Sequence, residues 1–130
     1  MFPFELVRLT DDENEVRVTV LSPMGDDLWE AEISVASLFV KGATLLVLYD
    51  SRLQAWKEAL VSLSQGRNID WMSESNGPTV TIELEGENGC PDVVVADESI
   101  SMVTVRIPVA LEDGWIAENQ ERLRRFMEEL

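Results

Sequence analysis

The stretch that decides the fold is LLVLYDSRLQAWKEALVSLSQGRNIDW, residues 45–71. Its first four residues are all apolar, which indicates a buried strand, and Asp50 and Ser51 then supply a helix-start signal. The apolar residues that follow at helical spacing are Leu53, Trp56, Leu60 and Leu63. Gly66 is suited to cap the C-terminus of this helix. The stretch therefore predicts a buried strand that leads directly into an amphipathic helix over residues 51–65, with Arg52 among its solvent-facing residues.

Alternation of apolar and polar residues predicts the strands of the first half. It predicts strands over residues 4–9, 16–21 and 29–35, with a turn at 22–27 between the last two. A fourth strand, over residues 38–48, has Lys41 and Gly42 as a turn or bulge. Because residues 45–48 are apolar on both sides of that strand, we expect its second face to be covered by the other half of the chain or by another subunit.

The second half follows the same plan. Strands are predicted over residues 79–84, 93–95 and 102–107, and a final helix begins near Asp113 as its N-cap. The apolar side of this helix contains Ile116, Leu123, Met127 and Leu130. The predicted fold class is α+β: a mainly antiparallel sheet of about seven strands with two amphipathic helices, in the order ββββ-α-βββ-α.

The halves 1–65 and 66–130 of this single domain, residues 1–130, also resemble each other. Trp56 follows Leu48 by eight residues, and Trp115 follows Ile107 by the same distance. Two readings remain open. The halves are a duplicated unit, or each helix independently places a large aromatic residue against a sheet.

Composition limits the classes of function. The chain has 25 acidic and 10 basic residues, and its net charge of −15 repels phosphate backbones, which argues against nucleic-acid binding. Its single cysteine, Cys90, cannot form an internal disulfide. Neither a secretion signal nor an apolar stretch of about 20 residues occurs, so we expect a cytoplasmic protein with no membrane span. The acidic surface serves solubility alone or attracts a basic partner.

Four sequence motifs stand out: W-x-x-x-L at 56–60, QGRNIDW at 65–71, GPTVTIE at 77–83 and SMVTVRIPV at 101–109. Together they resemble an uncharacterised family of small bacterial domains of unknown function, mainly from actinobacteria. The resemblance implies a bacterial origin and an α+β fold. It supplies no catalytic residue.

The sequence contains few of the side-chain combinations that common enzyme active sites and metal sites use. The chain has no histidine, which removes the usual general base and most zinc sites. Asp11, Glu13 and Glu15 alternate as calcium-loop ligands do, but Val16 stands where that loop needs glycine and Ser22 where it needs glutamate. We therefore predict no metal site and no cofactor.

The polar group singled out for partner binding lies on the segment 67–78. Arg67, Asp70 and Trp71, with Glu74, combine charge with an aromatic ring, as binding hot spots do. The alternative is an internal ion pair between Arg67 and Asp70 that only holds the loop.

Together these observations favour a non-enzymatic, acidic protein-interaction module. An immunity- or antitoxin-like neutraliser of a basic partner protein is its most concrete form, because net charge steers association. The alternative is a carboxylate- or metal-dependent enzyme of unknown substrate. A homodimer through the sheet face is compatible with either function.

Overall fold

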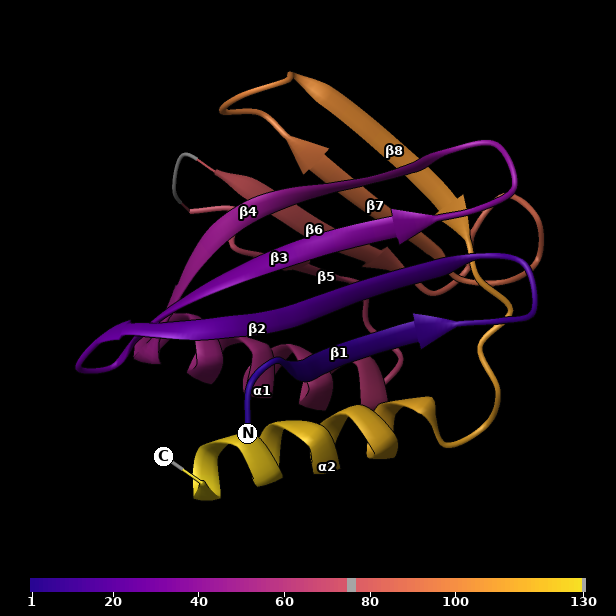
Figure 1. Ribbon diagram of the computed structural model, residues 1–130. Coiled ribbons are helices and arrows are strands. Elements are labelled where there is room, and N and C mark those ends of the chain that lie inside the picture. Colours follow the sequence, from indigo (N-terminus) through magenta and orange to yellow (C-terminus); the bar gives the residue numbers. More distant parts are fainter. Residues whose placement is uncertain (75–76, 130) are drawn as a thin grey trace.

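The protein folds into two four-stranded antiparallel sheets with two helices alongside them (Figure 1). The computed structural model describes residues 1–74 and 77–129. The first sheet contains, in spatial order, β1 (Phe4–Thr10), β2 (Glu15–Gly25), β3 (Leu28–Ala36) and β4 (Lys41–Tyr49). The second contains β5 (Ile69–Trp71), β6 (Pro78–Glu83), β7 (Asp92–Asp97) and β8 (Val103–Pro108). Helix α1 (Asp50–Ser64) follows the first sheet and α2 (Trp115–Glu128) follows the second.

The predicted α+β class is confirmed, but the described chain has eight strands rather than about seven. The additional strand, β5, lies inside the segment 67–78. Ile69 pairs with Ile82 and Trp71 pairs with Val80. Three residues are too short a run for alternation to identify a strand, so β5 is defined by its partner β6 rather than by its own pattern.

One hydrophobic core lies between the sheets and the helices. The predicted alternation is confirmed for residues 16–21 of β2 and for β3, because every second residue there is buried. The buried residues are Val16, Val18, Val20, Trp29, Ala31, Ile33 and Val35. Each sheet therefore presents one face to the core and the other to solvent, as antiparallel sheets commonly do.

The apolar run at the start of residues 45–71 is covered on one face only. Leu46 and Leu48 are buried, whereas Leu45 is 54% exposed and Val47 is 37% exposed. The prediction of a covered second face is therefore wrong for the chain by itself. The reason is that the whole first sheet turns this face to solvent, and β4, as its last strand, has a neighbouring strand on one side only.

Two predicted turns lie elsewhere. Residues 22–25 belong to β2, and the hairpin tip consists of Asp26 and Asp27, the latter with φ +55°. Lys41 and Gly42 begin β4, while the turn before them is closed by a hydrogen bond from the Ser37 N–H to the Val40 carbonyl at 2.8 Å.

Helix α1 follows the predicted pattern, since Leu53, Trp56, Leu60 and Leu63 are all buried. Gly66 follows its C-terminus at φ +80°, where the glycine N–H donates to the Leu63 carbonyl at 3.0 Å. Arg52, predicted to face solvent, is only 7% exposed. Its Nη1 donates to the Val47 carbonyl at 2.8 Å and its guanidinium lies over the Tyr49 ring. These partners explain why a charged side chain is buried here.

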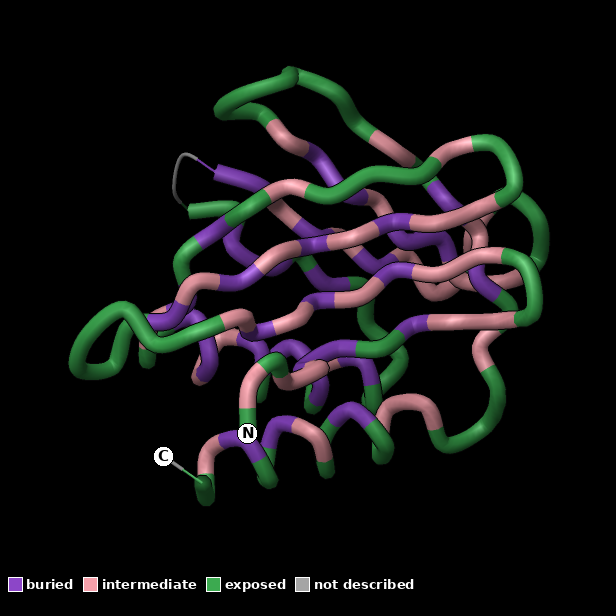
Figure 2. Tube along the Cα trace, viewed as in Figure 1, coloured by how far each residue is buried: buried purple, intermediate pink, exposed green. Residues whose placement is uncertain are grey.

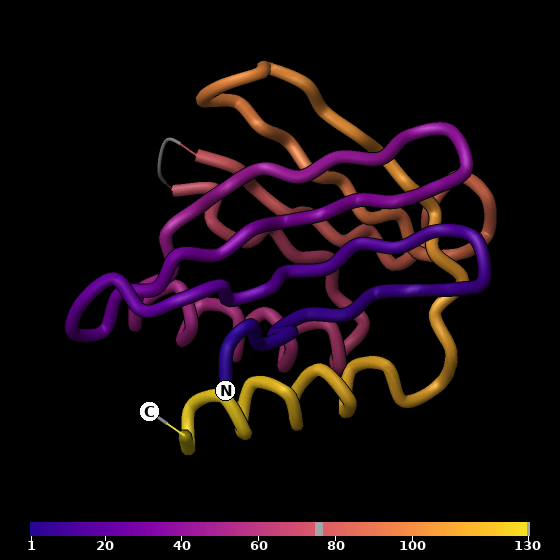
Figure 3. Tube along the Cα trace, in the orientation of Figure 1, coloured from indigo at the N-terminus to yellow at the C-terminus, as the bar shows by residue number. Residues whose placement is uncertain are grey.

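Helix α2 begins one residue later than predicted. Gly114, at φ +91°, occupies the N-cap position, and no side chain caps the helix, so the Asp113 prediction is wrong. Leu123 and Phe126 are buried as an apolar side requires, while Leu130 lies outside the described residues. Phe126 contacts the rings of Phe2, Phe4 and Trp29, so the N-terminal residues and the last helix lie side by side (Figure 3).

The two edges of the first sheet differ. At β1 the side-chain amide of Asn119 takes the place of a neighbouring strand: its Oδ1 accepts from the Arg8 N–H at 2.9 Å, and its Nδ2 donates to the Arg8 carbonyl at 3.1 Å. Helix α1 packs against β5 of the second sheet. At the opposite edges, β4 and β8 contain many exposed residues (Figure 2). The sandwich is therefore closed by helices along one side and open along the other.

The element order repeats, four strands and a helix in each half. The Trp56–Trp115 correspondence is not structural, however. Trp56 is the seventh residue of α1, whereas Trp115 is the first residue of α2. A common origin of the halves 1–65 and 66–130 stays a prediction that rests on topology alone.

Candidate functional site

The four residues predicted to form a partner site do not form one surface. Trp71 is only 1% exposed, whereas Arg67, Asp70 and Glu74 are exposed. Arg67 donates to the Gln65 side chain, and the Asp70 carboxylate accepts from the Thr81 hydroxyl at 2.6 Å. Within the described residues, no ion pair joins Arg67 to Asp70, so the internal-pair alternative is wrong as well.

Trp71 has a structural role. Its ring centroid lies 4.7 Å from that of Trp56, and its Nε1–H donates to the Arg52 carbonyl at 3.0 Å. Ile69 and Met72 of the same segment are buried as well, so the three side chains hold it against the core. A buried tryptophan concentrates apolar area and needs a hydrogen-bond partner for its N–H, and both conditions are met inside the fold. Its indole is therefore not available to a partner in this structure.

A polar pocket of about 400 Å³ lies between the β1–β2 turn and the connection from β8 to α2. We call it the acidic pocket. Its lining residues are Arg8, Thr10, Asp11, Asp12, Leu111, Glu112, Asp113, Trp115 and Glu118. Five of these nine side chains are carboxylates, and the indole of Trp115 supplies an aromatic wall. A carboxylate-rich hollow with an aromatic wall suits a guanidinium or ammonium group.

The β1–β2 turn is built by Asp11. Its Oδ1 accepts hydrogen bonds from the backbone N–H groups of Glu13 and Asn14, both at 2.7 Å, which forms an Asx turn. Its Oδ2 accepts from the Ala110 N–H at 2.8 Å, and the Asn14 side chain donates to the Pro108 carbonyl at 2.7 Å. The turn thus fixes the chain after β8, and that connection positions Glu112 and Asp113 at the pocket.

The Asp11 carboxyl is held in its ionised form. Desolvation by burial raises its pKa, but the backbone N–H groups of Ala110, Asn14 and Glu13 together outweigh this effect and lower the pKa below its usual value. A lowered pKa keeps a negative charge in place at neutral pH. It is the opposite of what a general acid needs.

The remaining acidic side chains are only partly neutralised. Glu118 pairs with Arg122 at 3.1 Å, and Arg8 pairs with Glu5 at 3.7 Å. Within residues 1–74 and 77–129, Asp12, Glu112 and Asp113 form no ion pair and are exposed. Three carboxylates therefore face solvent without an internal counter-ion.

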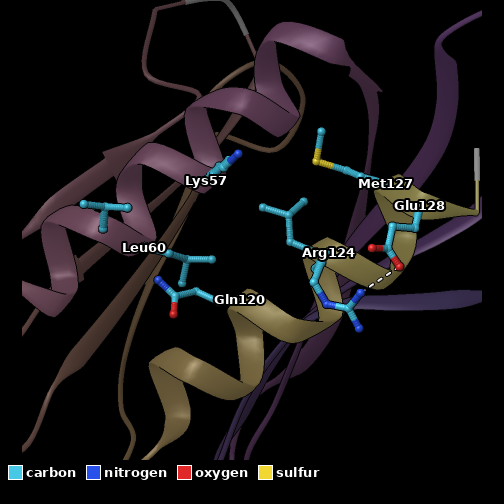
Figure 4. Close-up of a pocket in the computed structure, with 8 residues that line it drawn as sticks. Lys57, Leu60, Gln120, Arg124, Met127 and Glu128 are labelled. Carbon is cyan, nitrogen blue, oxygen red and sulfur yellow. Dashed lines mark ion pairs between the residues drawn. The ribbon is translucent and has the colours of Figure 1, made fainter.

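A second hollow, of about 370 Å³, lies between α1 and α2 (Figure 4). Its apolar lining consists of Leu60, Val61, Leu123 and Met127. Lys57 and Arg124 contribute charge at its rim, where Arg124 pairs with Glu128 at 2.7 Å. We call it the helix groove. Leu60 and Leu123 also belong to the hydrophobic core, so the groove borders that core.

Among the described residues, no group of three or more His, Cys, Asp or Glu side chains is placed to hold a metal ion. Cys90 is a half-buried free thiol in the β6–β7 turn. Nor does any helix in the described part of the chain have both the length and the apolar character needed to cross a bilayer.

Sequence reasoning missed the acidic pocket for a simple reason. Its carboxylates come from residues 11–12 and 112–118, which are about a hundred positions apart. The available signal was the pair of acidic turns, DDENE at 11–15 and EDG at 112–114, but nothing local indicates that they meet.

Comparison with known proteins gives a family without an assigned activity. No curated protein matches the chain. A family model described as "Family of unknown function (DUF5959)" matches residues 4–130. This confirms the resemblance to an uncharacterised family, while the bacterial origin stays a prediction. Since the match covers nearly the whole chain, the protein belongs to the DUF5959 family.

Proposed function

We propose that the protein is a non-enzymatic interaction module that binds a basic protein through the acidic pocket. The observation that carries the proposal is the meeting of Asp12, Glu112 and Asp113, which have no internal counter-ion, beside the Trp115 ring. An arginine or lysine of the partner enters the pocket, with its charge near the carboxylates and its stem against the indole.

The charge of the whole chain supports this choice of partner. Five of the ten basic residues, Arg8, Arg17, Arg106, Arg122 and Arg124, pair with carboxylates inside the fold. The net charge of −15 consequently resides mostly in acidic side chains without a paired cation. Such a surface accelerates encounter with a cationic protein and repels anionic competitors.

The most concrete form of this function is an immunity- or antitoxin-like neutraliser acting in the cytoplasm. A small acidic protein that covers the cationic surface of a toxin blocks the contacts that the toxin makes with an anionic target. Co-expression with the product of the neighbouring gene tests this form. Rescue of growth by the chain, lost with the double variant Glu112→Gln/Asp113→Asn, is the expected result.

The pocket itself is tested with a defined probe. A blocked tetrapeptide Gly-Arg-Arg-Gly is titrated into labelled protein, and its citrulline analogue, which is neutral but similar in shape, serves as the matched ligand. We expect the arginine peptide to shift the amide signals of residues 11–13 and 110–115 and the Trp115 indole signal. Its affinity should fall steeply as the salt concentration rises from about 50 to about 200 mM, over which the Debye length falls about twofold.

The matched protein control is Glu85→Gln/Glu87→Gln, which changes the net charge by the same amount in the β6–β7 turn. We expect Glu112→Gln/Asp113→Asn to weaken the arginine peptide about tenfold and the control to weaken it less than about twofold. Equal binding of the citrulline peptide, or equal weakening by both double variants, contradicts the proposal.

The alternative of a carboxylate- or metal-dependent enzyme gains no specific support from the pocket. The carboxyl of Asp11 is tied to three backbone N–H groups, and the other four carboxylates lie near the surface without a histidine or lysine beside them. The proposal is therefore stated for binding only.

A further inference from the structure

The open side of the sandwich exposes several large apolar residues. Leu45 and Val47 lie on the outer face of β4, and Val103, at the start of β8, is 55% exposed. The β3–β4 turn adds Leu38 and Phe39, which are 100% and 96% exposed. Exposed apolar patches of this kind commonly mark an interface.

The β4 edge also lacks the usual protection against pairing. Proteins normally place charges, prolines or bulges along an exposed edge strand. β4 has nine residues, pairs with β3 without a register shift, and has its one charged residue, Lys41, at its start. At the other end, Arg52 donates to the Val47 carbonyl. The centre, residues 42–46, contains neither a charge nor a proline.

We propose that β4 pairs with β4 of a second copy of this chain, antiparallel and centred on Leu45, so that the two first sheets join into one sheet of eight strands. In this register Lys41 lies opposite Tyr49 of the second copy and close to its Asp50. Asp50 thus lies near Lys41 of the other copy, twice about the two-fold axis, beside the Arg52 guanidinium that lies over Tyr49. Ala43, Leu45 and Val47 of both copies then form a continuous apolar strip on the outer face.

Hydrogen bonding does not prevent this pairing. The Val47 carbonyl already accepts from Arg52, but a carbonyl oxygen has two lone pairs and accepts a second donor. The charge distribution also permits two acidic copies to approach, because the edge centre is uncharged. Since β1 and β4 are opposite edges of the sheet, the acidic pockets beside β1 remain accessible at the far ends of the dimer. The dimer is thus independent of the proposed function.

The test is the molar mass in solution, measured by sedimentation velocity and light scattering from 5 to 500 µM, a range chosen to span about two decades in dissociation constant. We expect the wild-type protein to reach twice its 14.6 kDa monomer mass. Leu45→Lys places two like charges side by side on the two-fold axis and should weaken the dimer at least about tenfold. The matched control, Thr19→Lys, adds the same charge to the same face two strands away and should leave the mass unchanged.

The register is tested by charge exchange. Lys41→Glu should weaken the dimer by about fivefold, and the double variant Lys41→Glu/Asp50→Lys should restore it. A wild-type monomer at every concentration overturns the proposal, even if the edge accepts a strand from another protein. A dimer that resists Leu45→Lys but is lost with Val61→Lys overturns it too, because the helix groove would then be the interface. Glu112→Gln/Asp113→Asn leaves the dimer intact whether or not the acidic pocket binds arginine.

Discussion

The two edge strands of the first sheet, β1 and β4, each have backbone groups that no neighbouring strand pairs, and they differ in what covers those groups. At β1, the backbone of Arg8 is paired by the Asn119 side chain, and Arg122 donates to the Glu5 carbonyl at 3.4 Å, so helix α2 takes the place of a fifth strand. At β4, the Arg52 side chain donates to the Val47 carbonyl, and apolar side chains face solvent. One edge is completed by a helix of the chain, whereas the other exposes apolar residues.

The two edges also differ in charge: charged residues gather around β1, whereas β4 exposes apolar residues. Around β1, Glu5 is within 4 Å of three arginines, Arg8, Arg17 and Arg122, and the acidic pocket lies at the end of that strand. Along β4 the residues after Lys41 are uncharged. We infer that the two edges bind partners in different ways, by electrostatic binding of a basic protein beside β1 and by strand pairing at β4.

The largest effect is expected where α2 covers the sheet. Phe126→Ala removes a fully buried ring that contacts Phe2, Phe4 and Trp29, and should lower the free energy of unfolding by about 3–5 kcal/mol. Val47→Ala at the open edge should change it by less than about 0.5 kcal/mol in the monomer. Urea denaturation at low protein concentration measures both. Similar losses for the two variants would contradict the division into a closed and an open side.

The hydrogen bonds that complete the β1 edge should contribute less than the ring. Asn119→Ala leaves the Arg8 N–H and carbonyl without their partner in a partly buried place, and we expect a loss of about 1–2 kcal/mol. Amide hydrogen exchange gives the specific readout, because the Arg8 N–H should lose protection while core amides of β3 keep theirs. Unchanged protection at Arg8 would show that α2 does not act as a substitute strand.

An effect no larger than this is expected at the Asp11 turn. Asp11→Asn should cost about 1–2 kcal/mol at pH 7, because an amide cannot accept from Ala110 and the turn N–H groups at the same time. Since the pKa of Asp11 is lowered on folding, its ionised form stabilises the protein above its ordinary pKa of 3.8, and this contribution is lost as the pH falls through the lower, folded value.

The measurement is the difference in unfolding free energy between wild type and Asp11→Asn at pH 7, 5 and 3, with adjacent Asp12→Asn as the control. The difference should be constant from pH 7 to 5 and smaller at pH 3. Asp12 is exposed and makes no hydrogen bond that the structure records within residues 1–74 and 77–129, so its variant should behave as wild type. A difference that grows at low pH would mean that the Asp11 pKa is raised instead.

Local patterns predicted most elements but not their surroundings. Leu53, Trp56, Leu60 and Leu63 gave the correct face of α1, because a helical period is a property of neighbouring residues. Arg52 and Trp71 were misplaced because their type suggests a surface and a hot spot, whereas their hydrogen bonds, to the Val47 and Arg52 carbonyls, allow them to be buried. Their partners lie on other elements, so no window around either residue reveals them.

By itself, the sequence determined the α+β class, both helices, the alternating strands of the core and the strong negative charge, since each depends on local spacing or on composition. The tertiary structure alone decided which edge of the sheet is completed and which acidic residues gather. The stretch 45–71 illustrates the limit. Its apolar run correctly indicated a strand. Whether the second face of that strand is covered depends on how the sheets and helices pack around it, and the residues of a single strand do not reveal this.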